Sequence, residues 1–305
     1  MKAGKMSKKI IELSGVSKAF GSLKAVDDIH LAIEKGEIVG FVGVNGAGKS
    51  TTISMLLGFI APTSGTVRLL GQEVTLANAH KSHQHVGYAA GDMEMFDRLT
   101  ARQYLDFVLG QYGVKSRTRL EELIAKFQPQ LDKKIADLSR GNKQKIALIA
   151  AFAANPKVVI LDEPTSGLDP LMQQEFLQLI REEQKKGTTV FMSSHILSEV
   201  ADVCTRVVLI AGGKIIRDGD AGDYETLGKK RVRVVTQKPA KAPKNAGEVE
   251  TRKSAKSSVL TFVYTGKMTD LQVWVAGLKG VLDITIAEHG LEDAVFDLYK
   301  KEDER

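Results

Sequence analysis

Apolar runs of strand length alternate along the chain with stretches whose apolar residues recur at helical spacing. Continuous apolar runs at 38–42 and 158–161 predict buried strands, since a strand covered on both faces has no polar side. Alternating stretches at 10–13 and 26–33 predict strands with one exposed face. Another strand is expected at 188–192. Strands that alternate with helices predict a layered α/β domain.

Helical spacing appears in three regions between and after these strands. Leucine and aromatic residues between 98 and 128 predict a helical insertion, with Thr100 as the N-cap of its first helix. A strongly apolar helix is expected at 146–154, and a longer one from 168 to about 186. A hairpin that turns at Gly212-Gly213 is expected to end this domain.

The last quarter of the chain has an independent pattern. Its expected elements are a strand at 259–264, a helix at 269–278, a strand at 281–287 and a helix at 291–300. The stretch before them contains Pro239 and Pro243 among Lys, Ala and Ser residues, and part of it is expected to be a mobile loop. The predicted organisation is an α/β domain at 9–228, with its helical insertion at about 95–155, and a small α+β accessory domain at 229–305.

Composition indicates a soluble globular protein. The 305 residues are 43% hydrophobic and 26% charged, and no apolar stretch is long enough to span a membrane. The N-terminus is basic but has no signal-peptide apolar region. Cys204 is the only cysteine, which excludes an internal disulfide. These features predict a cytosolic, reducing compartment.

The net charge of +6 is unevenly distributed. Residues 229–257 contain ten Lys or Arg and two Glu, a net charge of +8, so the rest of the chain carries −2. The basic character therefore does not mark the whole protein as a nucleic-acid binder. Composition favours a solvated loop for this segment, with contact to anionic lipid headgroups as the alternative.

Residues 43–51 fit the phosphate-loop pattern G-x-x-x-x-G-K-[ST] and lie between a predicted strand and a predicted helix. Its glycines let backbone N–H groups turn inward toward phosphate oxygens, and a helix N-terminus favours the same anions. Lys49 is placed to reach the β- and γ-phosphates, and the Ser50 hydroxyl is placed to bind Mg²⁺.

Two acids and a histidine follow neighbouring strands. Asp162 and Glu163 end the apolar run at 158–161, where carboxylates reach the ligand-binding rim of a parallel sheet. Asp162 can hold Mg²⁺, and Glu163 can orient or deprotonate an attacking water. His195 follows the 188–192 strand and should reach the same rim. Phe20 could stack on a base, although its residue type alone favours a core position.

His80, His83 and His85 form a separate cluster. Their spacing could suit a metal ion, but no cysteine and no obvious carboxylate accompanies them. A solvated surface segment is therefore expected there.

With these residues in view, the chain from 9 to about 226 resembles an ATP-binding cassette (ABC) ATPase subunit. The family's motifs occur in the family's order: Walker A at 43–51, a signature at 138–144, Walker B at 160–163, a D-loop at 166–169 and a switch histidine at His195. Phe20 falls where the family's adenine-stacking aromatic lies, which reverses the expectation of a core position.

The resemblance implies an ABC-type P-loop fold, with a mixed sheet core, an antiparallel β subdomain and a helical insertion. It also implies ATP and Mg²⁺ as cofactors and a head-to-tail dimer, with a second copy or a related subunit, in which Ser139 and Gly141 bind the γ-phosphate held by the opposite subunit. The implied catalytic residues are Lys49, Glu163 and His195, and the implied magnesium ligands are Ser50 and Asp162. The implied nucleotide-binding residues are Phe20, Gly43, Asn45, Gly46, Ala47, Gly48, Lys49, Ser50, Thr51, Ser139, Gly141 and Asp169.

Two departures from the family pattern stand out. Arg140 replaces a signature glycine, in a form that resembles bacterial exporter ATPases of the type 2 permease class, and the segment 290–296 resembles the end of the same ATPases. The Q-loop glutamine is missing, because residues 89–92 read Ala-Ala-Gly-Asp. Asp92 is a neighbouring carboxylate and is predicted as a substitute that acts at the magnesium site.

The resemblance implies an ATP-hydrolysing subunit of an exporter that drives a separate membrane permease from the cytoplasmic face of the cell membrane. A soluble ABC ATPase that acts on ribosomes or nucleic acid is the alternative, although one cassette, no coiled coil and one cysteine speak against it. A degenerate regulatory cassette has little support, because Lys49, Asp162, Glu163 and His195 are all present. No nucleic-acid partner is expected.

Overall fold

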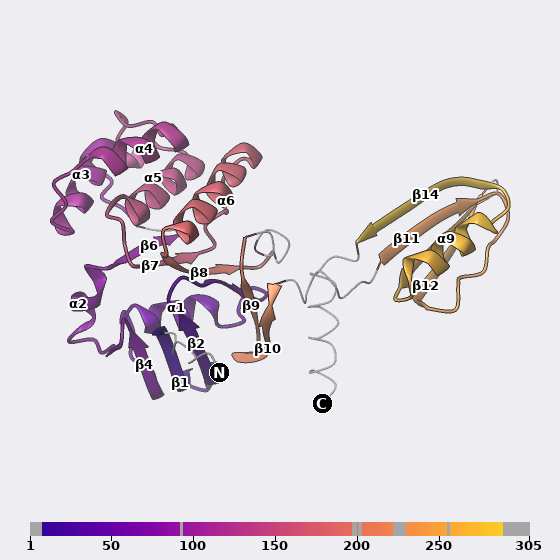
Figure 1. Cartoon of the computed structure of the whole chain (residues 1–305), viewed down its shortest axis with the longest axis horizontal. Helices are drawn as coiled ribbons and strands as arrows, with labels where there is room; N and C mark the ends of the chain where they lie inside the picture. The colour runs from indigo at the N-terminus through magenta and orange to yellow at the C-terminus, as the bar shows by residue number, and fades with distance from the viewer. Residues whose placement is uncertain are drawn as a thin grey trace, which may run out of the picture. The chain divides into compact units, whose positions relative to one another are not determined.

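The computed structural model describes residues 8–91, 94–196, 200, 203–221, 230–254 and 257–288. The chain divides into two compact units, residues 1–221 and 222–305 (Figure 1). Among the described residues, no helix is long and apolar enough to cross a membrane.

A six-stranded sheet forms the centre of the first unit. Its strand order is β10-β9-β3-β8-β7-β6. The bounds are β3 (Ile38–Val42), β6 (Val86–Ala90), β7 (Val158–Asp162), β8 (Thr189–Ser194), β9 (Arg206–Ala211) and β10 (Lys214–Asp220). Every neighbouring pair from β9 to β6 is parallel, and only β10 runs antiparallel to β9. The carboxyl ends of five strands therefore meet at one edge.

A second, antiparallel sheet has the strand order β2-β1-β4-β5. Its strands are β1 (Lys9–Phe20), β2 (Leu23–Glu34), β4 (Ser64–Leu69) and β5 (Gln72–Glu73). Figure 1 shows α1 (Lys49–Leu56) between this sheet and the six-stranded sheet. One buried hydrophobic cluster contains Ile11, Ile29, Ile53, Phe41 and Ile160, so both sheets and α1 share a core.

The helical insertion contains α3 (Ala101–Gln111), α4 (Thr118–Phe127), a short 3-10 turn (Ile135–Asp137) and α5 (Arg140–Ala153). The prediction for Thr100 is confirmed, because Thr100 and Gln103 form a reciprocal capping box at the start of α3. Helix α5 begins at Arg140, earlier than the apolar spacing from 146 predicts. Ser139 caps its polar first turn by accepting a hydrogen bond from the Asn142 N–H, and apolar periodicity does not detect such a turn.

The first unit also contains helices α2 (Ala79–His83) and α6 (Pro170–Lys185). Helix α6 matches its prediction closely. In α2, the prediction of a solvated surface is wrong for His83, which is partly buried. Its Nε2 lies 2.7 Å from the Leu57 carbonyl oxygen, and its ring meets Phe59 edge-on.

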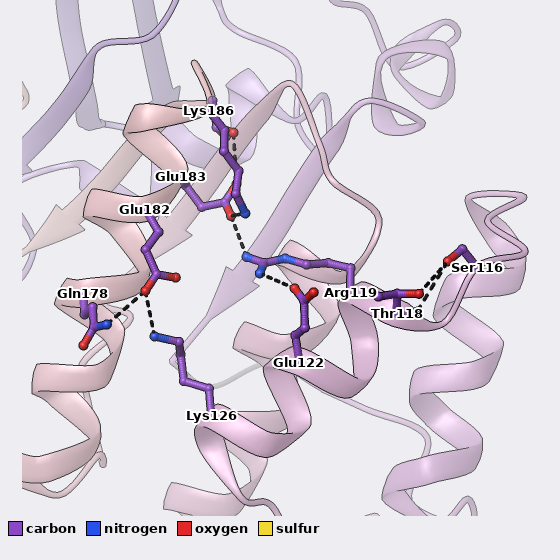
Figure 2. A network of polar contacts seen from close by, with 10 residues as sticks. Ser116, Thr118, Arg119, Glu122, Lys126, Gln178, Glu182, Glu183 and Lys186 are labelled. Carbon is purple, nitrogen blue, oxygen red and sulfur yellow. Dashed lines mark hydrogen bonds and ion pairs between the residues drawn. The ribbon is translucent and has the colours of Figure 1, made fainter.

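Charged side chains join the helical insertion to α6 (Figure 2). Arg119 of α4 donates from Nη2 to Glu183 Oε1 at 2.5 Å, and Lys126 of α4 contacts Glu182 at 3.1 Å. The Glu183 side chain is 3% exposed and that of Arg119 12% exposed. Thr188 Oγ1 donates to the second Glu183 oxygen at 3.1 Å, which further compensates the buried carboxylate.

The second unit is a four-stranded antiparallel sheet in the order β12-β13-β11-β14, with α9 against one face. The elements are β11 (Lys230–Thr236), β12 (Ala246–Lys253), β13 (Ser258–Tyr264), α9 (Met268–Ala276) and β14 (Val281–Glu288). Its core contains Val232, Val234, Leu260, Phe262 and Leu271.

The predicted strands at 259–264 and 281–287 and the predicted helix at 269–278 are confirmed, with ends shifted by at most two residues. Strands β11 and β12 occupy 230–236 and 246–253 of the basic stretch 229–257, where composition favoured a solvated loop. In β11, exposed Arg231 and Arg233 alternate with buried Val232 and Val234, so the charge conceals a strand pattern. The predicted helix at 291–300 lies outside the described residues.

We expect Glu183→Gln to destabilise the first unit by about 3 kcal/mol, because it removes the buried carboxylate of the pair and leaves the Arg119 guanidinium only the exposed Glu122. Urea unfolding followed by far-UV circular dichroism measures the loss. Fluorescence of Trp274, the only tryptophan, reports the second unit separately. Glu121→Gln is the control, because its pair with Arg102 is exposed and is expected to contribute less than about 1 kcal/mol. Equal losses in both variants would contradict this account of the bridge.

Candidate functional site

A pocket of about 750 Å³ opens at the carboxyl edge of the parallel strands. Ten of the residues predicted from the sequence line it: Phe20, Asn45, Gly46, Gly48, Lys49, Ser50, Thr51, Asp162, Glu163 and His195. They come from β1, the loop after β3 with the start of α1, and the ends of β7 and β8. The sheet thus brings together residues from four distant parts of the sequence.

The loop between β3 and α1 needs glycine for its path. Gly48 has a φ of 106°, and a Cβ there would lie 2.6 Å from the Ala25 carbonyl oxygen. A Cβ at Gly43 would lie 2.4 Å from the Ile210 carbonyl oxygen. The loop therefore lies against the backbone of its neighbours, and α1 begins at the pocket with its first-turn N–H groups. Such a helix start favours phosphate oxygens.

Lys49 is the first residue of α1 and is only 5% exposed. Its Nζ donates to the carbonyl oxygens of Gly43 at 2.6 Å and Val44 at 3.2 Å. The loop backbone thus holds the ammonium group in the wall of the pocket. A positive charge fixed there, beside the N–H groups of the helix start, suits a polyphosphate.

The two acids at the end of β7 are held differently. Asp162 ends the strand at 9% exposure, and Ser193 Oγ donates to its Oδ1 at 2.5 Å. Glu163 has a left-handed φ of 53°, which turns the chain out of the strand. Its Oε1 lies 3.3 Å from Lys49 Nζ, and its Oε2 contacts His195 Nδ1. One carboxylate therefore joins the phosphate loop to the end of β8.

Ser193 is a site residue that the sequence reasoning missed. It is fully buried, and besides its contact with Asp162 it accepts a hydrogen bond from the Glu163 N–H at 3.0 Å. The available signal was its position at the end of the strand that pairs in parallel with β7. A hydroxyl at that level of β8 faces the first acid of β7.

Gly91 lies where the family's Q-loop glutamine is expected, and it lines the pocket. Its N–H donates to the Asp162 carbonyl oxygen at 2.9 Å. A Cβ at this position would lie 3.3 Å from the Glu163 carbonyl oxygen, so glycine allows a close approach of the two turns. Burial raises the pKa of nearby Tyr88 to about 12, with a smaller contribution from Asp162. Asp92 lies outside the described residues.

The signature residues lie beside this pocket, on the first turn of α5. Gly141 packs tightly, because a Cβ there would lie 2.7 Å from the Gly167 carbonyl oxygen. Arg140, the departure from the family pattern, lines the pocket and donates from Nη2 to Ser166 Oγ at 3.0 Å. Arg140 is thus a charged pocket residue that the sequence reasoning did not assign to the site.

Five predicted residues, all described, are not part of the pocket wall. Ser139 caps α5, and Asp169 caps α6 by accepting a hydrogen bond from the Met172 N–H at 3.0 Å. Gly43 and Ala47 are buried within the loop, and Gly141 packs against Gly167. Phe20, in contrast, is 50% exposed at the wall, as the resemblance implies and its residue type alone does not.

The donor set in the pocket fits Mg²⁺. Ser50 and Asp162 supply a hydroxyl and a carboxylate oxygen, and Mg²⁺ in nucleotide sites takes few protein ligands beside water and phosphate oxygens. The part of the chain that the structure describes holds no cluster of three or more His, Cys, Asp or Glu residues suited to a metal ion. Two protein donors leave the other positions around such an ion to water or phosphate oxygens.

Comparison with known proteins agrees with this geometry. The family described as "ABC transporter" matches residues 26–166. YbhF, a probable multidrug ABC transporter ATP-binding protein of Escherichia coli, is 38% identical over 71% of this chain, but the chain spans only 38% of YbhF. The bacitracin transport ATP-binding protein BcrA of Bacillus licheniformis is 36% identical over 68% of this chain and 69% of its own length. NatA of Bacillus subtilis, an ABC transporter ATP-binding protein, is 34% identical over 69% and 89%.

Solved structures show the same fold. The ATP-binding subunit of an ABC transporter superposes with a TM-score of 0.65 at 28% identity, over 71% of this chain and 92% of that one. A dimeric ATP-binding cassette bound to ADP and Pi superposes with a TM-score of 0.64 at 24% identity, over 70% of this chain and 99% of that one, which bears on the fold alone. With its phosphate loop, paired acids and signature helix, this chain belongs to the family of ABC transporter ATP-binding proteins.

Proposed function

We propose that this chain is the ATP-hydrolysing subunit of an exporter and that it drives a separate membrane permease from the cytoplasmic face of the membrane. The observation that carries the proposal is the position of Glu163, which is held between Lys49 and His195 in the pocket that also contains the phosphate loop. A carboxylate in that place is suited to act on a water beside the γ-phosphate of ATP.

The proposed mechanism assigns each step to a residue of this chain. The adenine stacks on Phe20, and the loop N–H groups and Lys49 hold the phosphates and stabilise the charge that develops during transfer. Glu163 orients a water and takes its proton as the water oxygen bonds to the γ-phosphorus. The bond to the bridging β–γ oxygen then breaks, which yields ADP and phosphate. His195 positions the Glu163 carboxylate.

Magnesium would assist this reaction by balancing the charge of the phosphates. Bound by Ser50 and Asp162, it would neutralise charge on the β- and γ-phosphate oxygens. Ser193 fixes the Asp162 carboxylate through its hydrogen bond, and it also binds the Glu163 N–H. One buried serine thus sets the orientation of both acids.

The proposed partner subunit follows from predicted nucleotide-binding residues that do not line the pocket of this chain. Ser139, Gly141 and Asp169 would contribute to the nucleotide of a second cassette, in a head-to-tail dimer with a copy or a related subunit. The names of the relatives, which include bacitracin transport and Nod factor export, favour export over a role on ribosomes or nucleic acid. Asp92 remains our candidate substitute for the missing Q-loop side chain.

Replacement of Glu163 by Gln should lower ATP turnover by about 10²–10⁴-fold, because the amide cannot take a proton from water. Phosphate release measures turnover, and equilibrium dialysis with ATP checks that binding is kept. A variant with unchanged turnover would exclude Glu163 as the catalytic carboxylate.

Replacement of Ser193 by Ala should raise the Mg²⁺ concentration needed for half-maximal activity by about 10-fold, because Asp162 loses the hydrogen bond that orients it. A magnesium titration at saturating ATP measures the shift. Ser116→Ala is the control, since the Ser116 hydroxyl contacts only Thr118 among the described residues. If both variants titrated like the wild type, Ser193 would have no positioning role.

Affinity purification from detergent-solubilised membranes tests the transport assignment. A polytopic membrane protein should co-purify in stoichiometric amount and be identified by mass spectrometry. Recovery of ribosomal proteins or nucleic acid without a membrane chain would overturn it.

A further inference from the structure

A second cavity, of about 660 Å³, lies in the first unit at the opposite edge of the six-stranded sheet from the phosphate loop. Residues that precede the parallel strands line it, among them Lys35 before β3, His85 before β6, Lys157 before β7 and Thr188 before β8. We propose that this cavity binds a phosphate group carried by a small molecule or by a lipid headgroup.

The charge of the cavity wall is the first support for this proposal. Five lysines and one glutamate line it, so the wall carries a net charge of +4. Lys8, Lys35, Lys81 and Lys157 form no ion pair with any other described residue. This contrasts with lysines such as Lys9 and Lys126, which contact neighbouring carboxylates. Several uncompensated cations that share one cavity repel one another, and a multivalent anion relieves that repulsion.

The one acid in the wall does not oppose anion binding. Glu183 Oε1 accepts from Arg119 at 2.5 Å and from Lys186 at 2.8 Å, and Oε2 accepts from Thr188 at 3.1 Å. Two cations and a hydroxyl therefore compensate a carboxylate that is 3% exposed. The field that reaches the interior of the cavity comes mainly from the unpaired lysines.

A neutral donor adds to the charge of the wall. Ser82 of α2 lines the cavity at 6% exposure, and its hydroxyl can donate a hydrogen bond to a phosphate oxygen.

The size and the remaining wall indicate what else the ligand contains. A cavity of 660 Å³ is within the range of sites for small molecules and exceeds what a lone phosphate fills. Ile10, Leu70 and Pro156 give part of the wall apolar character. Lysine ammonium groups bind phosphate as point charges. Because the cavity is larger than a phosphate and partly apolar, the ligand we infer is a phosphate attached to an organic group.

Pyrophosphate is the first probe, titrated into the full chain by isothermal calorimetry. A saturating non-hydrolysable ATP analogue keeps the phosphate loop filled, and magnesium is omitted because it chelates pyrophosphate. The double variant Lys81→Ala/Lys157→Ala should bind about tenfold more weakly or worse, because it removes two charge-assisted contacts. Lys133→Ala/Lys134→Ala is the matched control, since it removes the same charge from exposed residues outside the cavity.

Flotation with phosphatidylcholine vesicles, with and without phosphatidylglycerol, is the second arm and distinguishes the two sources of phosphate. If the cavity variant loses pyrophosphate binding and the control variant keeps it, the ligand is a soluble phosphate compound. If the cavity variant loses vesicle binding and the control variant keeps it, the ligand is a lipid headgroup. Thermal unfolding of both variants checks that they fold. The proposal is overturned if neither arm detects binding, or if the cavity and control variants lose binding equally.

Discussion

The parallel pairing of β3, β8 and β7 is the constraint on which the site depends. These strands are buried along their whole length, and their register places Val42 beside Ser194 and Leu161 beside Met192. The phosphate loop, the two acids and His195 therefore leave the sheet at the same level. Side chains more than 140 positions apart in the sequence therefore line the same pocket. The register that brings them together is fixed by burial of the apolar strands.

The opposite edge of the same sheet, where the parallel strands begin, carries a different set of side chains. There the strands begin, and the lysines that precede them gather around a cavity in place of acids and glycines. Glu183 connects this edge to the helical insertion through Arg119, in a side-chain pair that is largely shielded from water. The two edges thus differ in charge and chemistry although the same strands build both.

Much of this could be predicted from the sequence, and the exceptions have physical reasons. The apolar runs and the phosphate-loop spacing predicted the central strands, the start of α1 and the acids of β7, because each depends on local sequence. Ser193 and Arg140 were missed, since their contacts with Asp162 and Ser166 exist only after the sheet and α5 are assembled. Strand β11 was missed because its exposed arginines mask a buried valine face, and the start of α5 because a serine cap defines it.

Equilibrium binding of a fluorescent ATP analogue to the full chain and to Lys49→Ala tests the central claim most directly. The account predicts binding of one nucleotide per chain and its loss, or a large drop in affinity, when the ammonium group held by Gly43 and Val44 is removed. Equal affinity in the two proteins would contradict the assignment of this pocket as the nucleotide site.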